Sequence, residues 1–211
     1  MRLKEKRGKT KDERQKTDFM LIGVTGGIGS GKSAVLREIQ ALGYPVYDTD
    51  AHAKRLICET PAIREALTAL FGEETFADNV YQTRHVAAQV FVDPALLQRL
   101  NAIVHPAVGD DLKRWAENKP LAFVESAVLF EAALDKQCDA ICIVTAPEDI
   151  RIERVIRRSG NTQTADDIRR RIQAQEANVP HAVVPVLRLD NDGSRSLSEL
   201  ADQLITFAQT L

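Results

Sequence analysis

The chain has 211 residues, 44% of them hydrophobic, and a formal net charge of −2. That hydrophobic fraction allows a sizeable core, whereas a net charge near zero gives no bulk attraction to nucleic acid or to a membrane surface. No apolar run approaches the length of a transmembrane helix, and no secretory signal is visible. The three cysteines are scattered, with no histidine pair beside them, so neither a disulfide framework nor a zinc site is expected. Reduced thiols and a cytoplasmic location are the simplest interpretation.

The N-terminal segment, residues 1–18, differs in composition from the rest of the chain. It is rich in Lys and Arg, is interrupted by acidic residues and has almost no apolar residues. Such a segment cannot bury enough surface to offset the entropy lost on ordering, so we predict a disordered basic tail. A solvated tail is favoured over a nucleic-acid-binding arm. Residues 19–211 are predicted to form a single domain.

The most informative stretch is LIGVTGGIGSGKSAVL, residues 21–36. Its apolar start predicts a short buried strand, and AVLREIQAL predicts a helix that Gly43 ends. Between them lies the motif G-x-x-x-x-G-K-S. Its glycines let the backbone wrap an anion with the N–H groups pointing inward, and the helix start adds a positive dipole end. The stretch therefore predicts a nucleoside triphosphate site.

Within this motif, Lys32 is expected to reach the β- and γ-phosphates and the Ser33 hydroxyl to ligand Mg²⁺. The residues assigned to nucleotide binding here all lie in the loop or the first helical turn: Gly26, Gly27, Ile28, Gly29, Ser30, Gly31, Lys32, Ser33 and Ala34.

A second strand is predicted over Pro45 to Tyr47, and Asp48 and Asp50 follow at its carboxyl end. Ligands bind at that edge of a doubly wound sheet, where a carboxylate can orient Mg²⁺ or accept a proton from an attacking hydroxyl. The alternative is an N-cap for a helix that begins at Ala51. For Asp50 we favour catalysis and metal binding, and for Asp48 both interpretations stay open.

From Pro61 to Asn118 the pattern is almost entirely helical, and no strand is expected. A connection of this size between parallel strands is far longer than usual, which predicts an inserted helical subdomain over residues 61–118 where the second substrate binds. Arg84 and His105 are its polar candidates. A lone histidine in an apolar helix is more often structural, and Pro106 more often a kink.

The run LAFVESAVLFEA predicts a buried strand whose end delivers Glu125 towards Mg²⁺. Glu131 either faces the substrate cleft or caps a helix. The next buried strand is expected over Asp139 to Thr145, and Pro147 is expected to start the following helix.

That helix is followed by a break at Ser159-Gly160 and by a second helix that is expected to end near Asn178, and both helices are rich in arginine. Arginines on a hinged helical pair can close over a triphosphate and exclude water, which predicts a lid over residues 151–178. Arg154 and Arg158 share a face and are assigned to the site. The other arginines, Arg151 among them, are assigned to the surface. The alternative is a solvated face with i,i+4 ion pairs.

The last elements are a strand over Val186 to Leu189, a polar turn and an amphipathic helix over Ser196 to Leu211. Asn191, Asp192 and Gly193 in the turn are assigned to the adenine ring through backbone contacts, although these residue types also suit a plain turn. Strand–helix alternation around a phosphate-binding loop predicts an α/β fold. We expect the P-loop NTPase fold, with a parallel five-stranded sheet flanked by helices, the inserted subdomain and the lid.

From Leu21 nearly to its C-terminus, the chain resembles the dephospho-CoA kinase family. The features that carry this resemblance follow one another in the family's order: TGGIGSGKS, the pair Asp48 and Asp50, NAIVHP at 101–106, Glu125 with SAVLFE, Arg154 with Arg158, Gln175, and the turn 191–193. Many proteins share the loop alone, whereas this combination is specific.

The resemblance implies transfer of the γ-phosphoryl group of ATP to the 3′-hydroxyl of the dephospho-CoA ribose, the last step of coenzyme A synthesis. It implies that Asp50 is the base, that Lys32, Arg154 and Arg158 are catalytic, and that ATP and Mg²⁺ are the cofactors. The residues it assigns to the acceptor are Asp48, Arg84, His105 and Glu125. We expect no nucleic-acid or membrane partner, and a monomer or weak homo-oligomer.

Departures from the family pattern are Ala34, where Thr is common, Ala127, where many members have Pro, and the basic tail. Two other classes stay open at this point. A related small-molecule kinase of the nucleoside monophosphate, shikimate or gluconate type would have a smaller insertion. A nucleotide-switch protein would carry a guanine motif such as N-K-x-D, and the sequence has none.

Overall fold

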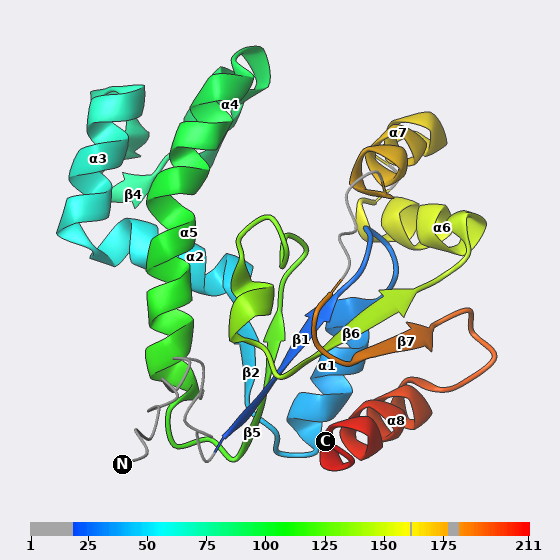
Figure 1. Ribbon diagram of the computed structural model, residues 1–211. Coiled ribbons are helices and arrows are strands. Elements are labelled where there is room, and N and C mark those ends of the chain that lie inside the picture. Colours follow the sequence, from blue (N-terminus) through cyan, green and yellow to red (C-terminus); the bar gives the residue numbers. More distant parts are fainter. Residues whose placement is uncertain (1–18, 161, 177–181) are drawn as a thin grey trace, which may run out of the picture.

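The computed structural model describes residues 19–160, 162–176 and 182–211. The predicted basic tail and the expected end of the lid near Asn178 lie outside these residues. At the centre is the predicted parallel five-stranded sheet (Figure 1). Its strand order is β2-β5-β1-β6-β7. Its strands are β1 (Met20–Thr25), β2 (Val46–Asp48), β5 (Leu121–Glu125), β6 (Ala140–Thr145) and β7 (Val186–Asp190).

Helices cover both faces of this sheet. Side chains alternate along a strand, so Ile22 of β1 packs in the core formed with α1 (Lys32–Ala41) and α8 (Leu197–Gln209). Leu21 packs in the opposite core with α5 (Pro94–Ala116). Burial on both faces explains the near-continuous apolar strands.

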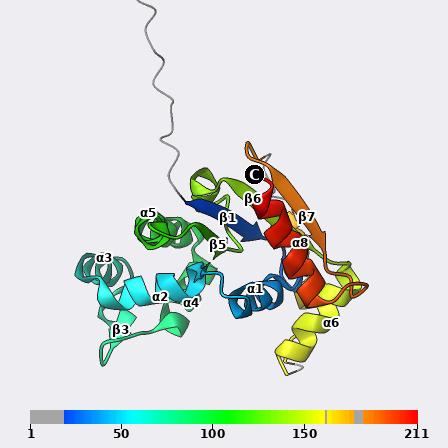
Figure 2. The ribbon, with the colours of Figure 1, turned by 90° about the horizontal axis from the view of Figure 1, so that it is seen from below.

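The expected helices between β2 and β5 are present as α2 (Thr49–Glu59), α3 (Pro61–Phe71), α4 (Thr83–Val92) and α5. They form a unit beside the sheet (Figures 1 and 2). None of the helices in the described part of the chain is both long enough and apolar enough to span a membrane.

The expectation of no strand in this span was wrong. After the short 3-10 helix η1 (Glu73–Thr75), β3 (Phe76–Ala77) and β4 (Val80–Tyr81) form an antiparallel hairpin. Asp78 and Asn79 both have positive φ, at 50° and 64°, which suits a two-residue hairpin turn. Strands of two residues are too short to show an alternating pattern.

The arginine-rich segment forms α6 (Glu148–Arg158) and α7 (Ala165–Glu176), and the predicted break at Ser159-Gly160 is present. Gly160 has φ 60°. The two helices pack through a small apolar cluster of their own, which also contacts Ile28 of the phosphate-binding loop. The remaining short helix, η2 (Leu134–Gln137), precedes β6.

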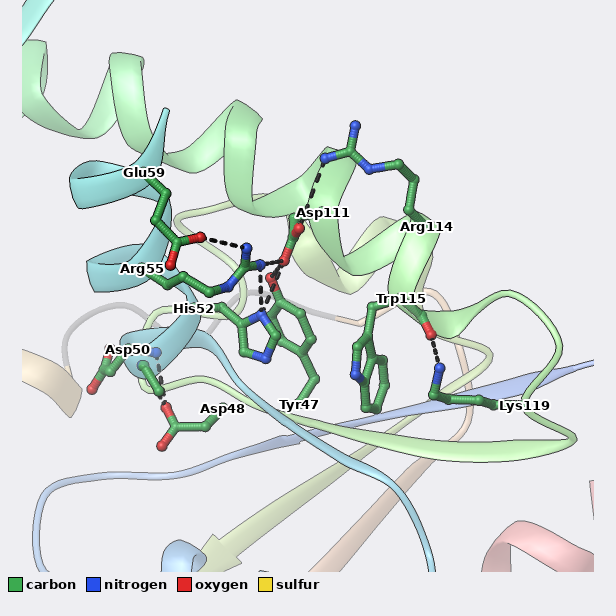
Figure 3. A network of polar contacts seen from close by, with 11 residues as sticks. Tyr47, Asp48, Asp50, His52, Arg55, Glu59, Asp111, Arg114, Trp115 and Lys119 are labelled. Carbon is green, nitrogen blue, oxygen red and sulfur yellow. Dashed lines mark hydrogen bonds and ion pairs between the residues drawn. The ribbon is translucent and has the colours of Figure 1, made fainter. Parts of the chain in front are cut away.

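A polar network ties α2 to α5 (Figure 3). The Oδ2 atom of Asp111 accepts hydrogen bonds from the Tyr47 hydroxyl at 2.8 Å and from Arg55 Nη2 at 2.8 Å, and lies 3.0 Å from His52 Nδ1. Burial alone would raise the pKa of Asp111, but the Tyr47, Arg55 and His52 hydrogen bonds outweigh it and lower the pKa to about 2. The ionised carboxylate therefore stabilises the fold.

We predict that Asp111→Asn destabilises the protein at neutral pH, and that this penalty shrinks in acid. Because the folded pKa of about 2 lies below the ordinary 3.8, the contribution is fully present above pH 4 and is lost as pH falls through 2. This pKa difference corresponds to about 2 kcal/mol in the free energy of unfolding, and about half of that contribution should be lost by pH 3. Urea unfolding of both proteins at pH 7, 4 and 3 tests this. A penalty that does not change with pH would contradict it.

Candidate active site

The phosphate-binding loop joins central strand β1 to α1, as the motif predicted. Gly31 caps the helix in the left-handed conformation, at φ 93°. A Cβ atom on Gly31 would lie 2.2 Å from Asn191 Nδ2, and one on Gly27 would lie 2.2 Å from Arg151 Nη2. The glycines leave room for these distant side chains directly against the loop backbone. The need for glycine is strictest at Gly26 and Gly29, where a Cβ atom would lie 2.2 Å from the Val144 carbonyl oxygen and 2.5 Å from the Arg151 carbonyl oxygen.

Lys32 folds across the loop, and its Nζ atom donates to the Gly26 carbonyl at 2.7 Å. Burial lowers the pKa of Lys32, and the nearby carboxylates of Glu125 and Asp50 partly oppose this effect. Lys32 begins α1 directly after the loop that follows β1, and Glu125 and Asp50 follow from the carboxyl ends of β5 and β2, so these three predicted site residues lie at one edge of the sheet.

Ser33 and Glu125 meet at the carboxyl edge of the sheet. Ser33 Oγ donates to Glu125 Oε1 at 2.5 Å, and Asp48 lies beside Glu125 in the register of β2 and β5. Among the described residues, no three His, Cys, Asp or Glu side chains form a group that could hold a metal ion. Ser33 and Asp50, the predicted metal ligands, offer one hydroxyl and one carboxylate. Such a set fits Mg²⁺, which keeps several waters and takes one or two protein ligands besides phosphate oxygens.

The helix after β2 begins at Thr49 rather than Ala51, and its N-cap is Asp48 rather than Asp50. Asp48 Oδ1 accepts from the backbone N–H groups of Asp50 at 2.9 Å and of Ala51 at 3.0 Å. One of its oxygens is therefore used for capping. The Asp50 side chain is exposed in the first turn of α2 (Figure 3) and does not cap the helix.

Helix α6 sends two arginines to the loop. Arg154 Nη1 donates to the Ser30 carbonyl at 3.3 Å, which places this side chain against the loop. Arg151 was wrongly assigned to the surface. It is 7% exposed, and its Nε atom donates to the Ile28 carbonyl at 2.9 Å. Its spacing of three residues from Arg154 was the available signal, because such residues share a helix face.

The other lid residues divide into two groups. Gln175 of α7 accepts a 2.7 Å hydrogen bond from the Ile28 N–H group, which ties the second helix to the loop. Arg158 is exposed but lies close enough to Lys32 to help lower the pKa of that lysine. Arg169 and Arg170 form ion pairs with acidic neighbours on the surface.

Asn191 sits in the predicted turn after β7, but its side chain faces the loop. Its Nδ2 atom donates to the Ser30 carbonyl at 2.8 Å, and its Oδ1 atom accepts from Arg154 Nη2 at 3.2 Å. Asp192 is exposed and accepts from the Ser194 backbone and hydroxyl within the turn. Asn191 therefore supports the loop, which sequence reasoning did not anticipate.

Two cavities lie beside the segment that follows β5. One, of about 280 Å³, is lined by loop residues including Gly26 and Ser30, and by Arg188 of β7. The other, of about 630 Å³, lies against α5 and is lined by His105 and Asn101. Glu131 lines both cavities, so the two are neighbours across one side chain.

His105 lines the larger cavity, and its contact with the acceptor stays a prediction. Burial lowers the pKa of His105, and the Glu131 carboxylate opposes this effect. Pro106 lies within α5 without ending it, and because proline has no N–H, the Ala102 carbonyl loses its helical donor beside the same cavity. Arg84 is not brought to this region. It is exposed at the start of α4 and lines neither cavity.

A nucleotide switch needs only the triphosphate site, whereas a kinase also needs room for an acceptor beside the γ-phosphate. Here the loop that would hold the phosphates also lines a cavity, and that cavity shares Glu131 with a second one against α5. The fold and the site thus define a P-loop kinase that acts on a small molecule.

The particular family follows from comparison with known proteins. The CoaE family model, described as dephospho-CoA kinase, matches residues 20–196. A dephospho-CoA kinase from Porphyromonas gingivalis is 41% identical over 160 residues, which cover 75% of this chain and 78% of that protein. The chain therefore belongs to the dephospho-CoA kinase family. It is a phosphotransferase that acts on an alcohol group, uses ATP, and catalyses the final step of coenzyme A biosynthesis.

Solved structures agree with this fold. The structure of TT1252 from Thermus thermophilus has a TM-score of 0.71 at 33% identity, and the match covers 92% of this chain and 98% of that chain. A dephospho-CoA kinase from Campylobacter jejuni has a TM-score of 0.62 at 18% identity, covering 90% of this chain and 98% of that chain.

We predict that Asn191→Ala raises the KM for ATP about 10-fold, because the Ser30 carbonyl loses its buried donor and the loop beside Gly31 loses its support. Ser194→Ala, an exposed change in the same turn, is the control and should leave this KM within about 2-fold. Steady-state kinetics with varied ATP measure both values. An unchanged KM in Asn191→Ala would contradict the supporting role.

Proposed function

We propose that the site transfers the γ-phosphoryl group of ATP to the 3′-hydroxyl of the dephospho-CoA ribose, with Asp50 as the base. The observation that best supports this is the placement of Lys32, Asp50 and Glu125 at one edge of the sheet, where the phosphate-binding loop also lies. Asp50 accepts the hydroxyl proton as the new O–P bond forms, and the bond from the γ-phosphorus to the bridging oxygen breaks to release ADP.

The phosphates are bound by the backbone N–H groups of residues 26–34 and by the start of α1. Lys32 leaves the Gly26 carbonyl and contacts the β- and γ-phosphates. Arg154 and Arg158 neutralise the charge that develops on the transferred group. The turn 191–193 flanks the adenine ring, with Asn191 contributing through its hold on the loop.

Ser33 and Asp50 would hold Mg²⁺ together with phosphate oxygens. The ion would supply positive charge that offsets the negative charge of the phosphates. Ser33 is already oriented by Glu125 at 2.5 Å, so Glu125 acts by positioning that hydroxyl as well as by contacting the acceptor.

The acceptor extends from the loop cavity towards α5, in contact with Asp48, Glu125 and His105. Contact between Arg84 and the acceptor stays a prediction that the exposed position of this side chain does not favour. Residues 61–118 act as the acceptor-binding subdomain and residues 151–178 as the lid. We place the protein in the cytoplasm, in keeping with its free cysteines. We also expect a monomer or weak homo-oligomer.

Asp50→Asn should lower kcat by about 100-fold or more, because the amide keeps the shape of the side chain but accepts the proton poorly. Lys32→Ala should cause a loss of similar size by removing charge from the phosphates. A coupled ADP-release assay with ATP, Mg²⁺ and dephospho-CoA measures kcat, and mass spectrometry of the product checks that it is one phosphate heavier. Near-wild-type turnover in folded Asp50→Asn would rule out the base assignment.

Arg154→Ala should lower kcat about 100-fold while the melting temperature changes by only a few degrees. Arg170, whose ion pair with Asp167 is exposed on α7, supplies the control. Arg170→Ala should leave kcat within about 2-fold. Loss of folding in Arg154→Ala without a kinetic defect in the surviving folded fraction would instead indicate a structural role.

A further inference from the structure

Asp111 lies outside the site described so far, yet its contacts surround the candidate base. Its three donors come from the segment that carries Asp50: Tyr47 at the end of β2, and His52 and Arg55 in α2. Figure 3 shows these side chains converging on Asp111, with Asp48 and Asp50 just below. Residues that contact Asp111 therefore lie on both sides of Asp50 in the chain.

The tethers hold this segment closely. The rings of Tyr47 and His52 stack with centroids 3.8 Å apart, and Trp115 of α5 meets the Tyr47 ring edge-on at 5.2 Å. Tyr47 is fully buried, and the Asp111 side chain is 14% exposed. Two residues before Asp111 lies Gly109, which lines the larger cavity together with His105.

Helix α5 lines the cavity with one face and packs against α2 with the opposite face. Residues 98, 102, 105 and 109 line the cavity and recur at the spacing of one helix face. Asp111 lies about 200° around the helix from Gly109, on the face that packs against α2. Helix α5 thus connects the larger cavity to the segment that bears Asp50.

We propose that Asp111 is a positioning residue for phosphoryl transfer, which holds the Tyr47–Arg55 segment, and with it Asp50, against the helix that lines the acceptor cavity. This inference rests on the proposed role of Asp50 as the base. The general reason is geometric: a base must lie within hydrogen-bond reach of the proton it accepts, and a displacement of about 1 Å can cost about 100-fold in rate.

The test is a double-mutant cycle of Asp50→Asn and Asp111→Asn, with the ADP-release assay on each of the four full-length proteins. Asp111→Asn should lower kcat at least about 10-fold and leave the KM for ATP within about 2-fold, because the loop is not in the network. In the Asp50→Asn background the same change should have little further effect on kcat, because a base that is already absent cannot be misplaced.

Two further variants keep the test decisive. Tyr47→Phe removes one donor but keeps the ring and the Asp111 charge, so it should lower kcat about 3-fold in the wild-type background alone. Arg114→Gln is the matched control. Arg114 reaches the other carboxylate oxygen of Asp111 at 3.7 Å and is 69% exposed, so its removal should leave kcat within about 2-fold.

The outcomes separate the two hypotheses. If Asp50→Asn alone keeps near-wild-type kcat, both the base assignment and the positioning role fail. If Asp50→Asn is impaired but Asp111→Asn lowers kcat by the same factor in both backgrounds, only the positioning role fails. The same conclusion follows if Tyr47→Phe and Asp111→Asn leave kcat unchanged. Urea midpoints for every variant confirm that folded protein is compared.

Discussion

The phosphate-binding loop is held by side chains from distant elements that pack directly against its backbone. Asn191 and Arg151 occupy the space that Cβ atoms on Gly31 and Gly27 would need. Both side chains also hydrogen-bond to loop carbonyls. The glycines therefore do more than permit an unusual backbone path. They let β7 and α6 hold the loop in shape.

The loop, the acids and the acceptor cavity belong to different parts of the chain, and the parallel sheet brings them together. Parallel strands end at one edge, so β2 and β5 deliver Asp48 and Glu125 side by side, next to the loop that follows β1. The long insertion returns through α5 to the start of β5. Helix α5 thus lines the larger cavity on one face and, through Asp111, contacts Tyr47 and the start of α2 on the other.

The acids at this edge illustrate how two similar residues acquire different tasks. Asp48 and Asp50 carry the same side chain and lie two residues apart in the sequence. Once the helix begins at Thr49, Asp48 is the residue placed to accept from the free N–H groups of the first turn. Asp50 then lies within the helix, with its carboxylate exposed near Lys32. A shift of two residues in the helix start thus separates capping from the proposed chemistry.

The sequence by itself determined the loop, the buried strands, most of the helices and the family, because these depend on local spacing and on motifs that stay together along the chain. Lys32, Ser33 and Glu125 could be assigned from it for that reason. Only the tertiary structure decided the tasks of Arg151, Asn191 and Asp111. Their partners lie far away in the sequence: Ile28 for Arg151, Ser30 for Asn191 and Tyr47 for Asp111. No periodicity or motif encodes such pairs, since they form only when separate elements pack against one another.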